Sequence, residues 1–519
     1  MGEEKRILSI DCGTQSVRAI IFDNKGNPTA GNKIEIKPYF SKKPGWAEQD
    51  PEVYWQNACR AMRSVKESNP KEWEKIVAIV VTTLRATQVF LDKNGEVIRP
   101  SILWLDQRKA KCEKPLRFFD KIMFSLISMK RTVEIIRRQS PANWMKENEP
   151  QLWDKTYKYM LVSGFFNYKL TGKFVDSVAS QIGLLPFDYK NQRWEESKNS
   201  WRWYVFGVEK EKLYDLVKAG SIIGGITKKA AEETGLKEGL PVIAGGSDKG
   251  CETLGNGCMD PTSANLSFGT TTTIQITSPN YFEPLKFMPP YPAVIPGNYN
   301  PEIEVFRGYW MITWFKKEFA QKEMEEAAEK HISAEELLNK RLNEIPPGSQ
   351  GLILQPYWGP HVKTPSAKGS IIGFGDVHTR MHVYRAIIEG INYALMEGLE
   401  KIEKKSKVKV QKIMVAGGGS QSSIICQITA DMFNKPVYRV NTHEVSALGA
   451  AIIGFVGMGI YKNYREAIEN MVHYKDTFEP NSENSEIYKK LYKNVYKKIY
   501  PNLEKVYKNI KEITNYPEI

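Results

Sequence analysis

The chain has 519 residues, 41% hydrophobic and 26% charged, a composition typical of globular proteins with sizeable cores and a length that suggests roughly two to four domains. Its net charge is +13, but the basic residues are scattered without interleaved aromatic residues, which argues against a nucleic-acid surface. No run reaches the ~18 apolar residues of a membrane span, a strand pattern begins at Ile7 without room for a secretory signal, and the six cysteines form no C-x-x-C pair or zinc spacing, so a cytoplasmic protein with reduced thiols is expected.

The chain opens with a strand–turn–strand pattern. Residues 7–11 predict a strand that ends in Asp11, and residues 17–22 predict a second strand after the polar turn Gly13-Thr14-Gln15-Ser16. No Walker or G-x-G-x-x-G motif occurs. The turn can direct backbone N–H groups and hydroxyls at an anion, and Asp11 beside it is suited to hold Mg²⁺ through water. On these residues alone, an ordinary hairpin turn is the alternative.

Several helices and strands follow in alternation. Residues 51–66 predict a helix capped by Asp50, and residues 76–83 predict a β-branched strand. The basic stretch 111–138 is interpreted as a solvated amphipathic helical face. The Pro- and aromatic-rich residues 279–300 are interpreted as a loop that crosses the second half of the molecule.

A cluster of mixed chemistry ends the strand pattern at residues 102–108. Trp104, Asp106 and Arg108 together suit a polyhydroxylated ligand, because the carboxylate and guanidinium bond hydroxyls while the indole covers an apolar sugar face. The alternative is a surface salt bridge beside a core tryptophan.

A carboxylate stands near the middle of the chain. Residues 242–244 predict a buried strand, two glycines follow, and Ser247 and Asp248 are favoured N-caps for a helix that starts near Lys249. Asp248 is therefore interpreted either as a helix cap only or as a reactive carboxylate at the boundary between two halves of the protein.

The opening pattern is repeated in the second half. Residues 266–274 again read as strand, hydroxyl-rich Gly-Thr turn and strand, and Gly13 and Gly269 lie 256 residues apart, close to half the chain. This repeat predicts two related lobes. Facing turns, with Thr14 on one side and Thr270 and Thr271 on the other, would hold a polyphosphate between them.

A glycine-rich turn follows the predicted strand at residues 412–416. Gly417, Gly418, Gly419 and Ser420 open a helix that runs to residue 433, and such a turn lets backbone approach a base or ribose. A long helix is expected over 381–404, and a helix from residue 443 with small residues indicates tight packing. The Lys- and Tyr-rich residues after 478 predict amphipathic helix without a site.

Taken in order, these motifs resemble the FGGY family of carbohydrate kinases, within the actin-like ATPase superfamily, over residues 6–475. Residues 365–374 with the helix after them are similar to the C-terminal signature of that family. The resemblance implies an α/β fold of two ribonuclease-H-like lobes, with mixed sheets flanked by helices and a cleft between the lobes. The expected division is an N-terminal sugar-binding lobe over 1–256, a nucleotide-binding lobe over 257–480 and a helical tail over 481–519.

The resemblance also implies roles for the residues. Asp248 is the expected general base, and Asp11 lies near Mg²⁺. ATP is expected between the two turns (Gly13, Thr14, Gln15, Ser16; Gly269, Thr270, Thr271), with its adenosine at the glycine-rich turn (Gly417, Gly418, Gly419, Ser420). The sugar is expected at four further residues besides Asp248 (Arg85, Trp104, Asp106, Arg108).

The substrate is predicted less directly. Glycerol kinases carry Arg-Glu at the position of Arg85-Ala86, and xylulose kinases carry Met-His at about this point, so the sequence departs from both patterns. A ketose such as a pentulose is the favoured substrate. Neither nucleic acid nor a membrane is expected as a partner, and a homodimer is left open. The alternatives are another polyol kinase, an actin- or chaperone-like ATPase without a small acceptor, and a catalytically silent binding protein.

Overall fold

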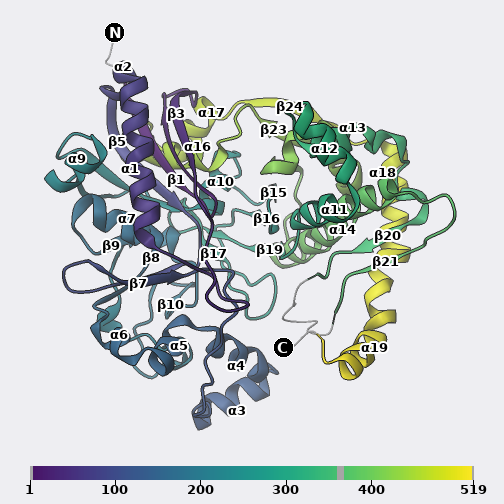
Figure 1. The fold of residues 1–519 in the computed structure, drawn as a ribbon, viewed down its shortest axis with the longest axis horizontal. Helices are drawn as coiled ribbons and strands as arrows, with labels where there is room; N and C mark the ends of the chain where they lie inside the picture. Colours follow the sequence, from purple (N-terminus) through teal and green to yellow (C-terminus); the bar gives the residue numbers. More distant parts are fainter. Residues whose placement is uncertain (1–3, 359–366, 517–519) are drawn as a thin grey trace.

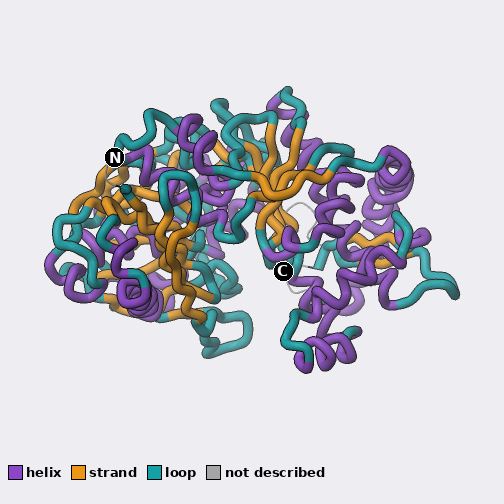
Figure 2. Tube along the Cα trace, turned by 90° about the horizontal axis from the view of Figure 1, so that it is seen from above, coloured by secondary structure: helices purple, strands orange, loops and turns teal. Residues whose placement is uncertain are grey.

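The computed structural model describes residues 4–358 and 367–516, which form two lobes side by side, the first coloured mostly purple to teal and the second mostly teal-green to yellow (Figure 1). Each lobe is built around a six-stranded mixed sheet with helices packed against it. Seen from above, the strands gather into two separate groups among the helices (Figure 2). This α/β architecture of two related lobes confirms the predicted fold class.

The first sheet has the order β13-β14-β5-β1-β2-β3. Its three central strands are parallel to one another, and β13, β2 and β3 run antiparallel to their neighbours. Two of the predicted strands match closely, and the predicted bounds of β5 are those observed. The strands are β1 (Arg6–Cys12), β2 (Ser16–Phe22), β3 (Pro28–Glu35), β5 (Ile76–Thr83), β13 (Ile222–Gly225) and β14 (Pro241–Ser247).

The second sheet repeats this plan with the order β19-β16-β15-β22-β23-β24. Here β15, β22 and β23 are parallel, and the outer strands β19, β16 and β24 are antiparallel to their neighbours. The same sequence of strand directions in both sheets indicates that the predicted repeat is structural. The strands are β15 (Ser263–Phe268), β16 (Thr272–Ile276), β19 (Glu302–Val305), β22 (Lys412–Ala416), β23 (Val437–Val440) and β24 (Tyr474–Phe478).

Two helices join the lobes: α10 (Asp248–Gly255), which follows the first sheet, and α16 (Val445–Gly457), which follows β23. They cross so closely that a Cβ at Gly449 would lie 1.8 Å from the Cys251 carbonyl oxygen, and one at Gly255 would lie 2.1 Å from the Val445 carbonyl oxygen. Although α16 follows a second-lobe strand, its apolar side chains share a core with strands β1, β5 and β14. The tight packing predicted for this helix is confirmed.

The largest flanking helices bury an apolar face on their own sheet. In the first lobe α1 (Pro51–Ser68) begins where predicted, and Asp50 accepts the Glu52 N–H as its cap. In the second lobe α14 (Arg380–Ser406) and α15 (Ser423–Phe433) supply much of the core. Other helices of the first lobe are α2 (Pro70–Trp73), α3 (Phe118–Leu126), α4 (Lys130–Gln139), α5 (Pro141–Asn148), α6 (Pro150–Lys155), α7 (Val162–Thr171), α8 (Trp201–Phe206) and α9 (Lys228–Thr234).

Smaller elements complete both lobes. A four-stranded sheet in the first lobe contains β4 (Glu48–Gln49), β6 (Gln88–Leu91), β7 (Val97–Ile102) and β8 (Lys158–Leu161). Short two-stranded pairs are formed by β9 (Val175–Ser177) with β12 (Asp215–Val217), β10 (Phe187–Asp188) with β11 (Arg193–Trp194), β17 (Tyr291–Pro292) with β18 (Tyr299–Asn300), and β20 (Ile353–Gln355) with β21 (Ser370–Ile372). The second lobe adds α11 (Trp310–Phe319), α12 (Gln321–Glu329), α13 (Ala334–Lys340) and α17 (Tyr464–Met471).

The C-terminal helices are part of the second lobe's core. In α18 (Ser482–Leu491), the following π-helical turn (Tyr492–Tyr496) and α19 (Lys497–Thr514), the rings of Tyr488, Tyr492 and Tyr496 are buried against α14. The predicted boundaries at residues 256 and 480 remain predictions. Among the residues described, no helix combines the length and the apolar character that crossing a membrane requires.

The interpretation of residues 279–300 as a loop across the second lobe is wrong. This segment reaches the first lobe, where the Tyr299 hydroxyl donates to the Lys190 carbonyl at 2.5 Å and Lys286 Nζ donates to the Ile127 carbonyl at 2.6 Å. Part of the C-terminal signature, Pro365 and Ser366, lies outside the described residues.

Candidate active site

Three neighbouring parallel strands of the first sheet end at one edge. In the ladder Cys12 lies beside Thr83, and Thr83 lies beside Ser247. Gly13 and Asp248 follow their strands directly, and Arg85 follows Thr83 after one intervening residue, so the first turn, a guanidinium and a carboxylate emerge together. The sequence pattern of strands ending in polar residues thus leads to one site, here termed the junction because the second lobe meets the first lobe there.

Asp248 is the first residue of α10, not its cap. The Ser247 hydroxyl accepts the Gly250 N–H at 3.2 Å and fills the capping role, while Asp248 Oδ1 accepts the Lys249 N–H at 2.7 Å. The Asp248 side chain is 30% exposed, which leaves carboxylate surface open to a ligand. The interpretation of Asp248 as a cap only is therefore wrong.

Arg85 links Asp248 to the second lobe. Its Nε lies 3.8 Å from Asp248 Oδ1, and its Nη1 donates to both carboxylate oxygens of Glu302 on β19, at 3.0 and 3.2 Å. Its guanidinium also lies over the ring of Tyr291, 5.3 Å from the centroid. Burial opposes the charge on Arg85, but Glu302 and Asp248 together outweigh it and raise the pKa of the guanidinium. Arg85 is thus a fixed cation beside the carboxylate.

Asp11 is buried on the same edge. Burial raises the pKa of its carboxyl to about 6, the Arg18 guanidinium opposes this shift, and the charges of Glu444 and Asp248 add to it. Arg18 Nη1 donates to Asp11 Oδ2 at 3.0 Å, and its Nε lies 3.5 Å from Glu444. A hard cation nearby would relieve this crowding of carboxylates, so the donor chemistry fits Mg²⁺ held through water. Within residues 4–358 and 367–516 no three His, Cys, Asp or Glu side chains form a ready-made metal cluster.

The two Gly-Thr turns differ in their hydrogen bonds and in the exposure of their residues. In the first, the Gly13 N–H donates to the Ser16 carbonyl at 3.0 Å, Gln15 is exposed, and Trp104 Nε1 donates to Thr14 Oγ1 at 3.2 Å. In the second, Gly269 is partly exposed and Thr270 is exposed, while Thr271 Oγ1 donates to the Phe306 carbonyl at 3.0 Å. Both turns therefore keep exposed surface that a ligand can contact, and Trp104 is hydrogen-bonded to the first turn.

The glycine-rich turn lies beside the second Gly-Thr turn, because β15 and β22 are parallel neighbours with Ser267 next to Ala416. Gly417 has φ of +82°, and a Cβ there would come within 2.7 Å of the Phe268 carbonyl oxygen, so another residue would be strained. Gly418 faces open space, whereas Gly419 is covered by the Tyr309 ring. The Ser420 hydroxyl donates to the Gly417 carbonyl at 2.7 Å and holds the turn.

Asp106 and Arg108 lie in a buried ion-pair network instead of facing the junction. Their side chains are 2% and 3% exposed. Arg108 donates to both oxygens of Asp106 and to Glu48 Oε1, and Asp106 accepts the Ala47 N–H. The guanidinium also lies 4.0 Å from the centroid of Trp46. Both oxygens of Asp106 and all three guanidinium nitrogens of Arg108 are already paired, which argues against the predicted sugar contacts of these two residues.

Three junction residues were not predicted from the sequence. Lys249 could have been suspected, because a lysine in the first turn of a helix is electrostatically unfavourable. Glu302 and Glu444 approach from the second lobe through long-range folding, and no local pattern marks them.

Two repeated lobes, whose strand ends meet with a carboxylate, a guanidinium and two Gly-Thr turns between them, define a phosphotransferase of the actin-like ATPase class. The chain belongs to the FGGY family of carbohydrate kinases: the N-terminal domain of that family matches residues 6–255 and its C-terminal domain matches residues 264–458. The predicted family and the predicted enzyme class are confirmed, and the protein is a carbohydrate kinase.

Similar proteins span nearly the whole chain. An uncharacterized sugar kinase of Escherichia coli (strain K12) is 27% identical, covering 93% of this chain and 91% of the relative. A xylulose kinase of Lactococcus lactis is 28% identical, covering 98% of each. The crystal structure of xylulose kinase from Rhodospirillum rubrum has a TM-score of 0.82 at 24% identity, covering 97% of this chain and 100% of that one, and shows the same fold.

Proposed function

We propose that the protein transfers the γ-phosphoryl group of ATP to a hydroxyl of a ketose, most specifically a pentulose, with Asp248 as the general base. The observation that carries this proposal is the position of Asp248, partly exposed at the junction and 3.8 Å from the Arg85 guanidinium. A single sugar hydroxyl placed there can accept from Arg85 and donate to Asp248. The xylulose kinase of Lactococcus lactis, which aligns with nearly the whole chain, supports a pentulose.

Phosphoryl transfer does not require a strong general base. Phosphoryl transfer is driven mainly by positioning and by neutralisation of charge on the phosphoryl oxygens. Asp248 accepts the hydroxyl proton as the bond from oxygen to phosphorus forms, when that proton has become acidic. The fixed positive charge of Arg85 orients the acceptor, and lobe closure excludes water, which would otherwise compete with the sugar.

The second lobe is suited to the nucleotide. The exposed backbone around Gly269 and Thr270 offers N–H groups to phosphate, and open space at Gly418 leaves room for the adenosine. Mg²⁺ is assigned to Asp11 through water, where it would neutralise phosphate charge. We place the reaction in the cytoplasm, which the six free cysteines support.

A coupled assay of ADP release tests the proposal, with glycerol, erythritol, xylulose, ribulose and gluconate as acceptors. The expected result is a low rate of ATP turnover without acceptor and the highest kcat/KM with a pentulose. Equal turnover with and without sugar would favour an ATPase that phosphorylates no small molecule. A preference for glycerol would contradict the assignment to a ketose, despite Ala86 standing where glycerol kinases carry Glu.

A further inference from the structure

Lys249 occupies an electrostatically costly position. It lies in the first turn of α10, where the helix dipole is positive and a cation is disfavoured. Its side chain is only 18% exposed, so water screens the ammonium poorly. A charge kept in such a place needs a partner of opposite sign.

The ammonium reaches across the junction to the second lobe. Nζ donates to the Ser267 hydroxyl near the end of β15 and lies 3.4 Å from Glu252 Oε2. A Cβ on Gly269 would be 3.8 Å from this same nitrogen. The positive charge is therefore located beside the second Gly-Thr turn, in the residue directly after Asp248.

Glu252 compensates this charge incompletely. Its Oε1 accepts from Asn265 Nδ2 at 3.1 Å, its Oε2 accepts from the Ser267 hydroxyl at 3.1 Å, and the ammonium is farther away than in a typical charge-assisted hydrogen bond. An ammonium has three N–H donors, and the described residues engage two of them. Ser267 and Glu252 thus hold the Lys249 side chain in place and leave one N–H donor of its ammonium for a ligand at the second Gly-Thr turn.

We propose that Lys249 binds an oxygen of the transferring phosphoryl group and is a second catalytic residue, an inference that rests on the proposed function. In the transfer the bond from the sugar oxygen to phosphorus forms, and the bond from phosphorus to the bridging oxygen of ADP breaks. The hydroxyl proton passes to Asp248. Lys249 keeps its own proton and neutralises charge on the phosphoryl oxygens, the largest requirement of such a reaction.

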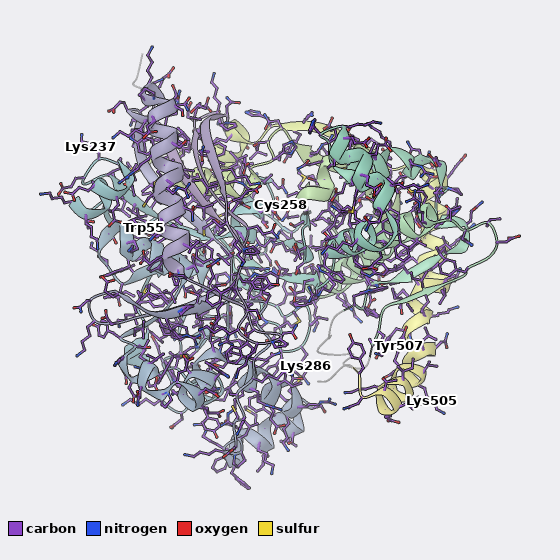
Figure 3. All side chains as sticks on the ribbon, in the orientation of Figure 1. Trp55, Lys237, Cys258, Lys286, Lys505 and Tyr507 are labelled. Carbon is purple, nitrogen blue, oxygen red and sulfur yellow. The ribbon has the colours of Figure 1, made fainter. Side chains whose placement is uncertain are left out.

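A binding experiment tests this role without any acceptor sugar. Tryptophan fluorescence titrations measure the affinities of ADP and of a non-hydrolysable ATP analogue for the wild type, K249M, K249R and the control K237M. Lys237 is exposed at the outer side of the first lobe, far from the junction (Figure 3). K249M is expected to weaken the analogue about tenfold and ADP less than about twofold, because a charge-assisted contact to the third phosphate is lost. Equal affinities of K249M and wild type for both nucleotides would overturn the proposal.

Kinetics separate catalysis from structure. K249M is expected to lower kcat about 100-fold with little change in the KM of the sugar, and K249R to recover part of that loss. A loss that falls entirely on the KM of the sugar would place Lys249 at the acceptor, and equal defects of K249M and K249R with a lower Tm would make it structural. Either result overturns the proposal. If no sugar is phosphorylated, the proposed function fails while the nucleotide titrations still decide the role of Lys249.

Discussion

The two lobes repeat one arrangement of strands but end those strands with different chemistry. In the first lobe β1, β5 and β14 lead to Asp11, Arg85 and Asp248, which are charged. In the second lobe β15 and β22 lead to Gly269 and Gly417, where backbone is exposed. Under the proposed function, this difference corresponds to a division of labour in which the first lobe supplies reactive and orienting side chains and the second supplies surface for a nucleotide.

The division also affects packing. Charged strand ends in the first lobe need compensating partners, and two of these, Glu302 and Glu444, come from the other side of the junction. The glycines of the second lobe need backbone freedom and room instead. Each prediction below perturbs one side of this comparison, from the largest expected effect to the smallest.

The largest effect on stability is expected at Asp106. D106N should lower the free energy of unfolding by about 3 kcal/mol, because it weakens a buried ion pair and leaves Arg108 with less compensation. Urea unfolding followed by tryptophan fluorescence measures this, with the exposed Glu238 as the control E238Q. The ranking of acceptor sugars should not change, and an altered ranking at full stability would return Asp106 to the sugar site.

Arg85 distinguishes orientation of the sugar from support between the lobes. R85M should raise the KM of the sugar about 50-fold, because a charged hydrogen bond to the acceptor is lost. E302Q removes the charge of the inter-lobe partner but keeps the guanidinium, so it should raise that KM much less, and R465M on the exposed surface should have no effect. Equal increases in the KM of the sugar for R85M and E302Q would show that Arg85 acts by linking the two lobes and not by orienting the sugar.

Two adjacent glycines test the second lobe. G417A should destabilise the protein by about 2 kcal/mol, because φ of +82° and contact with the Phe268 carbonyl oppose a side chain. G418A adds a methyl group in open space, so its Tm should be unchanged while the KM of ATP rises. An unchanged KM of ATP in G418A would contradict the proposal that the adenosine binds at this turn.

The smallest effect concerns pH. Burial raises the pKa of Asp176, under the first sheet, to about 7 from an ordinary value of 3.8, although four donors including Ser163 and Gln181 oppose the shift. Protonation of the folded state therefore stabilises it at low pH, and this contribution is lost as the pH rises through about 7. The wild type should lose about 1 kcal/mol more than D176N between pH 6 and 7. Equal losses in urea unfolding would show that Asp176 does not titrate there.

The sequence predicted local features better than pairings over a distance. The strands at residues 76–83 and 412–416 were predicted with their observed bounds, because apolar β-branched runs are a local signal. Arg108 pairs with Asp106 and also with Glu48, which lies 60 residues away, so the same local pattern suited both a sugar site and a buried ion-pair network. Similarly, nothing in residues 279–300 indicated that Tyr299 would contact the first lobe. The polar and charged residues at the strand ends could be predicted from the sequence, whereas the orientation of their side chains depended on tertiary packing.

The central claim is that Asp248 receives the proton of the acceptor hydroxyl, and the most direct test is sugar-dependent ADP release by D248N. Compared with wild type and with E238Q, D248N should lose about 10³-fold in kcat while it still binds ADP and sugar, because the base is lost and the shape is kept. A kcat within tenfold of wild type at unchanged stability would contradict the claim.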